Sequence, residues 1–360
     1  MKDILSTSKS SLNALVAKNP LFVCVISYTA TSEIPGLTVA GANPKLIKYT
    51  SPADAEFLHY GKCKCIEAVP ATPDGKPTPA LITRAALKAA EIPLLVVDAG
   101  ARIKPSIPYV SLGIAAGNNI LKENAMDESS VRTAFDHSMT LGRQLAKMSD
   151  LIVIGESIPG GTTTALAVLS ALGINAKFKV SSSMPENPHD LKNKIVESAI
   201  KRAGGSKAHS PFEAIAKFGD PMMPSVAGIA SGVIDAGGKV MLAGGTQMSA
   251  VVAIMAHIGR PLGRRLCIGT TSYVVNDPSA DLAGLVRAAQ HVPILSCDLH
   301  LGESSKPGLQ AFAKGFVKEG VGAGGASIAA MLKSRGKITA KRLLRAIEKE
   351  YESSIESRLS

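Results

Sequence analysis

A single carboxylate stands at the head of a glycine-rich run near the end of the chain. Glu319 is followed by four glycines in the stretch KEGVGAGGA, residues 318–326. Glycine lets a backbone approach a ligand closely and adopt positive φ, so such a run forms either a tight turn or the lining of a site. The rest of the chain has to decide between these two interpretations.

A glycine pair followed by threonines stands in the stretch GESIPGGTTTALAV, residues 155–168. Gly160 and Gly161 come before Thr162 and Thr163, and an apolar helical pattern follows. A glycine turn at a helix N-terminus presents free N–H groups and the positive end of the helix dipole, which suit a phosphate. A capped helix after a tight turn is the structural alternative. The stretch matches neither the P-loop pattern nor the dinucleotide pattern G-x-G-x-x-G.

A second glycine pair repeats this order in LAGGTQMSAVVA, residues 242–253. Gly244 and Gly245 follow a buried-looking strand and come before Thr246, Gln247 and a helical pattern. One such turn is weak evidence. Two in one sheet, with Glu156 and Gln247 at their mouths, favour a phosphorylated ligand.

Two further stretches offer weaker candidates. Asp98 ends the apolar run in VVDAGARIKP (96–105), where it could orient a ribose hydroxyl, although a structural cap is the favoured role. In LHLGESSKPG (299–308), Ser304 and Ser305 offer hydroxyls beside a lysine, and a surface turn is the alternative.

Short runs rich in Val, Ile and Leu recur along the chain without polar alternation. Such runs suit strands that are covered on both faces. The runs are residues 22–29, 94–100, 151–157, 240–245, 265–275 and 292–299. Helical patterns closed by glycine lie between them, for example in residues 162–173, 190–204 and 246–259. The alternation predicts an α/β fold with a Rossmann-like, mostly parallel sheet flanked by helices.

Composition changes toward the ends of the chain. Residues 43–84 are richer in proline and polar residues, so we predict loops that form one wall of a cleft. After residue 300 the strands stop, and the last stretch has apolar positions at helical spacing. We therefore expect a catalytic α/β domain over 20–300, and a smaller helical lobe from 1–19 plus 301–360 that carries the Glu319 loop.

The overall charge of +11 raises the question of nucleic acid. Aromatic residues are only 4% of the 360 and there is no tryptophan, so stacking on single-stranded bases is poorly supported. Basic residues are scattered except in 333–345, which we interpret as the solvated face of a helix. We expect no nucleic-acid partner, and anionic small substrates fit the charge instead.

The cysteines and the hydropathy of the sequence bear on disulfides, metal sites and membrane segments. The five cysteines do not form a disulfide framework in a chain this long, and KCKC (62–65) lacks a second ligand pair, so we expect reduced thiols and no metal site. The first 20 residues lack the apolar core of a signal peptide. The longest uncharged apolar stretch, 240–256, is interrupted by Gly-Gly-Thr-Gln, so we expect no membrane span and a cytoplasmic protein.

Taken in order, these segments resemble a known family. GESIPGGTT (155–163), GGTQ (244–247) and KEGVGAGG (318–325) are similar to three motifs of the nicotinate-nucleotide:dimethylbenzimidazole phosphoribosyltransferases, GEMGIGNTT, GG-[FL]-E and GEGTGA. The resemblance covers roughly residues 90 to 330 and is closer to the divergent, largely archaeal branch. Pro159, Gly161 and Gln247 depart from the family pattern.

The resemblance implies a reaction and a set of roles. The 5-phosphoribosyl group of nicotinate mononucleotide would pass to a benzimidazole-type base, giving an α-ribazole phosphate for cobamide assembly and releasing nicotinate. Glu319 would be the general base, and Glu156 would hold the base or the ribose. Gly160, Gly161 and Thr162 would bind the 5′-phosphate, with help from Lys192, Ser304 and Ser305.

The other candidates join the substrate-binding set on the same basis: Thr163, Gly244, Gly245, Gln247, Gly320, Gly322 and Asp98. The resemblance also implies a homodimer, and neither a metal nor a cofactor. Two alternatives stay open from the residues alone. One is another nucleotide-using α/β enzyme, such as a nucleoside phosphorylase or a kinase-like protein, and the other is a nucleotide-binding homologue without activity.

Overall fold

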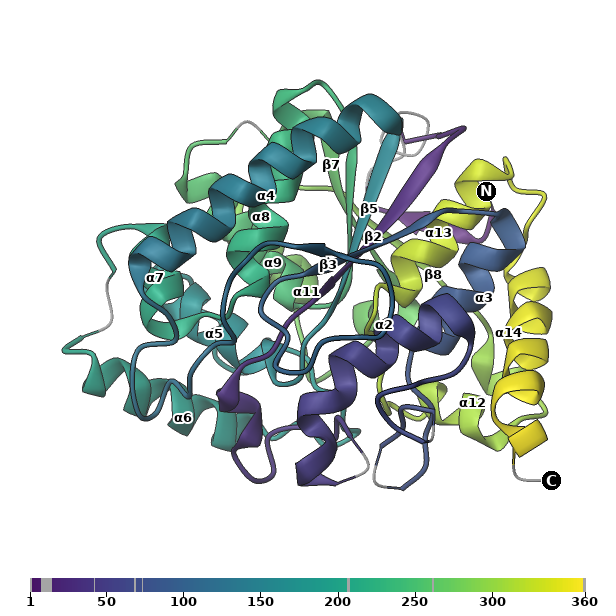
Figure 1. The fold of residues 1–360 in the computed structure, drawn as a ribbon, viewed down its shortest axis with the longest axis horizontal. Helices are drawn as coiled ribbons and strands as arrows, with labels where there is room; N and C mark the ends of the chain where they lie inside the picture. Colours follow the sequence, from purple (N-terminus) through teal and green to yellow (C-terminus); the bar gives the residue numbers. More distant parts are fainter. Residues whose placement is uncertain are drawn as a thin grey trace.

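The structure is a computed structural model, and it describes residues 2–7, 15–41, 43–67, 69–72, 74–205, 208–260 and 262–358. In these residues an eight-stranded sheet lies between two layers of helices (Figure 1). The strands are β1 (Ile4–Ser6), β2 (Pro20–Ile26), β3 (Leu94–Asp98), β4 (Val110–Ser111), β5 (Leu151–Ser157), β6 (Val240–Ala243), β7 (Leu266–Thr271) and β8 (Ile294–Cys297).

The strands stand in the order β1-β8-β7-β6-β5-β2-β3-β4. Every neighbouring pair in this sheet is parallel except β1 with β8. The predicted Rossmann-like, mostly parallel sheet is therefore confirmed. From β2 the chain winds outward through β3 in one direction and through β5 in the other, so the strand order reverses between β2 and β5. Ligands of such sheets bind outside the carboxyl ends of the strands at this reversal.

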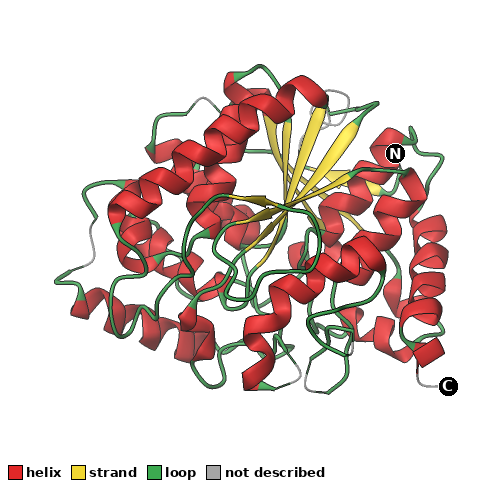
Figure 2. Cartoon of the chain, viewed as in Figure 1, coloured by secondary structure: helices red, strands yellow, loops and turns green. Residues whose placement is uncertain are grey.

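Helices cover both faces of the sheet (Figure 2). They are α2 (Thr50–Tyr60), α3 (Ala80–Ala90), α4 (Glu128–Met148), α5 (Gly161–Ala171), α6 (His189–Arg202), α7 (Pro211–Phe218), α8 (Met222–Asp235), α9 (Gln247–His257), α10 (Ser272–Val275), α11 (Leu282–Ala289), α12 (Pro307–Ala313), α13 (Ala323–Lys333) and α14 (Ala340–Ser354).

Successive residues of a strand pack in two different hydrophobic cores, one on each face of the sheet. Val23 and Ile152 pack with the α4, α5, α8 and α9 layer, while Phe22 and Val153 pack with α3, α13 and α14. Because both faces are buried, every residue of β5 is buried. This double burial is the reason that the strand sequences show no polar alternation.

The prediction of loops for residues 43–84 is wrong over α2 and over residues 80–84, where α3 begins. Eight of the eleven residues of α2 are buried, so the helix shows no polar face and no clear 3.6-residue period. Residues 61–67, 69–72 and 74–79 do connect α2 to α3 without a helix or strand of their own.

The two ends of the chain pack on the sheet. The strand β1 pairs with the edge strand β8, and α13 contacts β5, β6, β7 and β8. No strand follows β8 in the described residues up to 358, as the sequence predicts. The division into residues 20–300 and a lobe made from 1–19 and 301–360 stays a prediction.

Candidate active site

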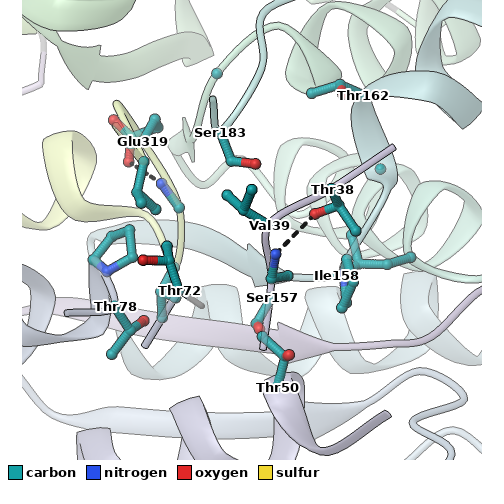
Figure 3. A pocket seen from close by; sticks show the side chains of 18 of the residues that line it. Thr38, Val39, Thr50, Thr72, Thr78, Ser157, Ile158, Thr162, Ser183 and Glu319 are labelled. Atoms are coloured by element: carbon teal, nitrogen blue, oxygen red, sulfur yellow. Dashed lines mark hydrogen bonds between the residues drawn. The ribbon is translucent and has the colours of Figure 1, made fainter. Parts of the chain in front are cut away.

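A cleft opens at the carboxyl ends of the central strands. It contains about 1030 Å³ of space, a figure that includes open solvent. The described lining comes from residues 37–41, 70–72, 76–79, 156–162, 181–183 and 317–321, with Thr50, Asp54, Gly245, Gln247 and Val274. Figure 3 shows Glu319, Thr72 and Thr78 at one end and Thr162 at the other.

The Glu319 loop is held by its own backbone and by its neighbours. Val321 donates its N–H to the carbonyl of Glu156 at 3.0 Å, and Gly320 and Gly322 have positive φ. The Glu319 carboxylate lies at the N-terminus of α13. Its Oε2 accepts from the Thr271 amide at 2.9 Å and from the Gly324 amide at 3.2 Å.

This setting changes the acidity of Glu319. Burial raises its pKa to about 7, although hydrogen bonds from the Gly320, Gly324 and Thr271 amides oppose the shift. A carboxylate with a pKa near 7 is a better proton acceptor than an ordinary glutamate and is still substantially ionised at neutral pH. The burial thus gives Glu319 the acidity that general base catalysis requires.

Glu156 is the next-to-last residue of β5 and lines the same cleft. Gln247 donates from Nε2 to its Oε1 at 2.5 Å. Burial, followed by the nearby carboxylates of Asp220 and Glu319, raises the pKa of Glu156 to about 8. Glu156 is therefore mainly protonated at neutral pH, so it can both donate and accept a hydrogen bond.

The first glycine pair starts a helix that points at the cleft. Gly160 has φ of 77° and forms the N-cap of α5, with no side-chain cap, and Gly161 is the first helical residue. A Cβ on Gly161 would lie 3.2 Å from Nε2 of Gln247, so a side chain there would crowd the contact with Glu156. The positive end of α5 faces the cleft beside Thr162.

The two residues of the second glycine pair have different surroundings. Gly245 lines the cleft, and a Cβ there would lie 3.8 Å from Cβ of Glu319. Gly244 is outside the lining, where a Cβ would meet Cε of Met248 at 2.9 Å. Gly245 therefore keeps space open next to Glu319, and Gly244 serves the packing of α9.

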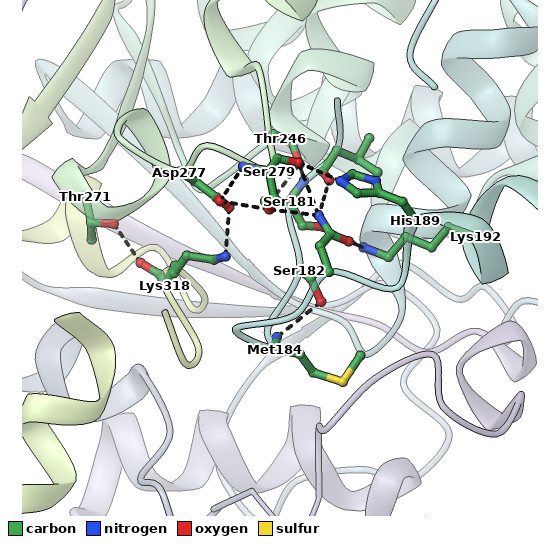
Figure 4. Close-up of polar contacts among 12 residues, drawn as sticks. Ser181, Ser182, Met184, His189, Lys192, Thr246, Thr271, Asp277, Ser279 and Lys318 are labelled. Carbon is green, nitrogen blue, oxygen red and sulfur yellow. Dashed lines mark hydrogen bonds and ion pairs between the residues drawn. The ribbon is translucent and has the colours of Figure 1, made fainter. Parts of the chain in front are cut away.

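A buried polar network stands behind residues 181–183 (Figure 4). Lys192 donates from Nζ to the carbonyl of Ser181 at 2.6 Å, so it lies one layer behind the cleft. Lys318 lines the cleft and pairs with Asp277 at 2.7 Å. Burial, and then repulsion from Lys318, lower the pKa of Lys192 to about 7.

Several predicted residues lie away from the cleft lining. Ser304 donates to Glu348 at 2.7 Å, and the Ser305 amide faces the same carboxylate. Asp98 accepts from the Ala101 amide at 2.8 Å and pairs with Lys104. In these contacts each of the three residues is bonded to other parts of the protein. Thr163 and Gly322 are also outside the lining, and both pack in the interior.

Sequence reasoning missed several parts of the lining. Among the polar ones are Lys318, Asp54 and the serines at 181–183. Lys318 stands next to Glu319 in the glycine-rich run, so its position was a usable signal. Asp54 and the serines carry no motif, because helix α2 and the loop after α5, which are distant in sequence, bring them to the cleft.

The described residues also bear on membrane insertion and on metal binding. None of the described helices has the length and apolar character needed to span a bilayer. Within the same residues, no group of three or more His, Cys, Asp or Glu side chains is arranged to hold a metal ion.

The doubly wound sheet defines an α/β protein with a cleft where sheets of this type bind their ligands. A phosphoribosyltransferase family model matches residues 81–311, and the chain belongs to this family. It is 51% identical to a UPF0284 protein of Archaeoglobus fulgidus over 92% of this chain and 93% of that protein. It is 46% identical to a UPF0284 protein of Sulfolobus acidocaldarius over 96% of this chain and 97% of that protein.

Solved structures share the fold. The nicotinate-nucleotide-dimethylbenzimidazole phosphoribosyltransferase of Thermus thermophilus superposes with a TM-score of 0.62 at 18% identity, covering 93% of this chain and 86% of that one. A structure of CobT from the same organism gives 0.61 at 18% identity, with 93% and 88% covered. The resemblance to this family is confirmed, and the protein is a transferase of the phosphoribosyl class.

Proposed function

We propose that the protein transfers the 5-phosphoribosyl group of nicotinate mononucleotide to a benzimidazole-type base, as a step in cobamide lower-ligand assembly. The observation that carries the proposal is the convergence of Glu319, Glu156 and the α5 N-terminus on one cleft. The name of the similar Thermus structure supports the choice of substrates. We further propose that the enzyme works as a cytoplasmic homodimer.

The cleft offers a place for each part of the nucleotide. The 5′-phosphate lies against Gly160, Gly161 and Thr162, where the positive end of α5 favours an anion. Lys192 adds positive charge from behind Ser181 without a direct contact. The incoming base lies at the opposite end, next to Glu319.

The reaction is then a displacement at C1′ of the ribose. A ring nitrogen of the base attacks C1′, the bond from C1′ to the pyridinium nitrogen breaks, and its electron pair leaves with nicotinate. Glu319 takes the N–H proton from the other ring nitrogen of the base, which removes the positive charge that the attack creates, and general base catalysis of this type contributes about 10²–10⁴-fold. Glu156, neutral and held by Gln247, hydrogen-bonds the base or the ribose hydroxyls.

The test is to incubate the pure protein with nicotinate mononucleotide and a panel of bases without added metal, and to follow nicotinate by chromatography. We expect nicotinate to appear only when an acceptable base is present. Binding of the nucleotide without release, for every base in the panel, would contradict the proposal and favour a nucleotide-binding protein without activity. Release that requires ATP and Mg²⁺ would favour another class of nucleotide-using enzyme.

A further inference from the structure

A hairpin-like loop, residues 69–72 and 74–79, forms the wall of the cleft on the Glu319 side. Two backbone hydrogen bonds of 2.9 Å join its two arms. The Thr72 amide donates to the carbonyl of Lys76, and the Thr78 amide donates to the carbonyl of Pro70. Lys76 and six other members of the loop line the cleft. Thr72 and Thr78 lie at the same end of the cleft as Glu319 (Figure 3).

The hairpin is fixed to the body of the protein by a buried carboxylate. Asp54 of α2 accepts hydrogen bonds of 2.7 Å from Thr78 and from Ser157, which joins the hairpin to the end of β5. The hairpin also lies close to the Glu319 loop: a Cβ on Gly320 would be 3.2 Å from Cγ of Pro79. A base held against Glu319 therefore also faces this wall.

Most of the hairpin wall has no side-chain donor left for a ligand. Thr72 donates its hydroxyl to Asp74 at 2.5 Å, and Thr78 donates to Asp54. The other lining members are prolines and an alanine, apart from Lys76. Lys76 is thus the side chain of the described hairpin that can supply a hydrogen bond to the edge of a base.

Lys76 and Lys318 are the cationic side chains of the described lining. They differ in how strongly an acidic partner holds each of them. The Lys318 pair with Asp277 is almost fully buried, with side chains 6% and 3% exposed, so breaking it would leave a buried charge without a partner. Lys76 pairs at 2.6 Å with Asp74, with side chains 28% and 49% exposed. Such solvated pairs are weak and exchange readily, so Lys76 can turn to a ligand.

A cation–π contact keeps the Lys76 ammonium near the Glu319 end of the cleft, where we propose that the base binds. Its Nζ lies 5.0 Å from the centre of the Phe316 ring, three residues before Glu319. This cation–π contact holds the ammonium beside the Glu319 loop without using its hydrogen-bond donors.

We propose that Lys76 is a specificity-determining residue, which makes the site prefer a base with an anionic or acceptor substituent on its outer edge over a base with methyl groups there. The inference rests on the proposed function. With its ring nitrogen at Glu319, a bicyclic base extends along the proline-rich hairpin, and its far edge meets the Lys76 ammonium. A charged acceptor there gains a charge-assisted hydrogen bond, whereas methyl groups gain none.

The experiment compares two bases, benzimidazole-5-carboxylate and 5,6-dimethylbenzimidazole, with nicotinate mononucleotide as donor. The measured quantity is the ratio of their kcat/KM values. We expect the ratio to fall about tenfold in Lys76→Met, the effect of one lost charge-assisted contact, and to stay within about threefold of wild type in Lys76→Arg. Asp74→Asn, which removes the competing carboxylate, should raise the ratio.

The outcomes separate this inference from the proposed function. An unchanged ratio in Lys76→Met, from an enzyme that still transfers to both bases, would overturn the role of Lys76 and leave the proposed function standing. A wild-type protein that transfers to no base would overturn both. Thermal unfolding of each variant shows whether it is folded, and Lys76→Gln provides a second neutral variant if Lys76→Met is unstable.

Discussion

Glu156 and Glu319 are carboxylates that the fold keeps away from water. Their burial favours the protonated form, which is why both pKa values lie well above the ordinary 4.5. In the unfolded chain Glu156 loses its proton above about pH 4.5, but in the folded protein it keeps the proton up to about pH 8. The stability contributed by this proton is complete below pH 4.5 and is lost as the pH rises to about 8.

Glu156→Gln removes this titration while keeping the size of the side chain and a partner for Gln247. We expect the variant to be more stable than wild type at pH 8, by roughly 1–3 kcal/mol, and the difference to shrink toward pH 5. Thermal or urea unfolding at several pH values measures it. Glu123→Gln is the control, because it makes the same change at a carboxylate that is exposed to water. A Glu156→Gln variant that is equally destabilised at every pH would contradict the argument.

At the scale of elements, α13 depends on glycine for its distance from the sheet. A Cβ on Gly324 would lie 2.0 Å from the carbonyl carbon of Thr270, and one on Gly325 would lie 2.3 Å from Cβ of Ala243. The amide of Gly324 also binds the Glu319 carboxylate. The glycines after Glu319 therefore bring the helix against β7, and this approach places the carboxylate.

Gly324→Ala should accordingly push α13 away from β7. We expect a loss of stability of about 2 kcal/mol or more, because the clash is with backbone atoms that cannot rotate away. Urea unfolding measures the loss. Gly302→Ala is the matched control, since its Cβ would meet only the Cβ of Ala313 at 3.2 Å. Equal stabilities of the two variants would contradict the account of α13.

The elements also show what local sequence can and cannot predict. The strands β2, β3, β5, β6, β7 and β8 follow from continuous apolar runs, because double burial leaves a direct mark on composition. The helix α2 escaped prediction because it is buried on most sides. The short strands β1 and β4 have too few residues to show any pattern.

At the scale of the whole molecule, the parallel sheet explains which site residues were predictable. Glu156, Gly160 and Gln247 lie at or just after the carboxyl ends of neighbouring strands, so topology alone brings them together. Ser304 and Ser305 follow β8 but their chain turns toward α14, which no local pattern indicates. The Asp277 network behind the cleft depends on tertiary contacts between separate loops, so it was equally hidden.

The net charge of +11 also belongs to this scale. A positive protein attracts anionic small molecules over long distances. The charge thus has a use that does not require nucleic acid. In the proposed reaction the fold must add a general base beside the bound nucleotide, and Glu319 is the residue that we propose for this role.

The most direct measurement is the single-turnover rate of transfer from nicotinate mononucleotide to 5,6-dimethylbenzimidazole, followed across pH in wild type and Glu319→Gln. Because Glu319 must be ionised to accept a proton, the wild-type rate should rise with pH through about 7. The variant should bind the nucleotide about as well and react about 10²–10⁴-fold more slowly. A folded Glu319→Gln protein with the full wild-type rate would contradict the account.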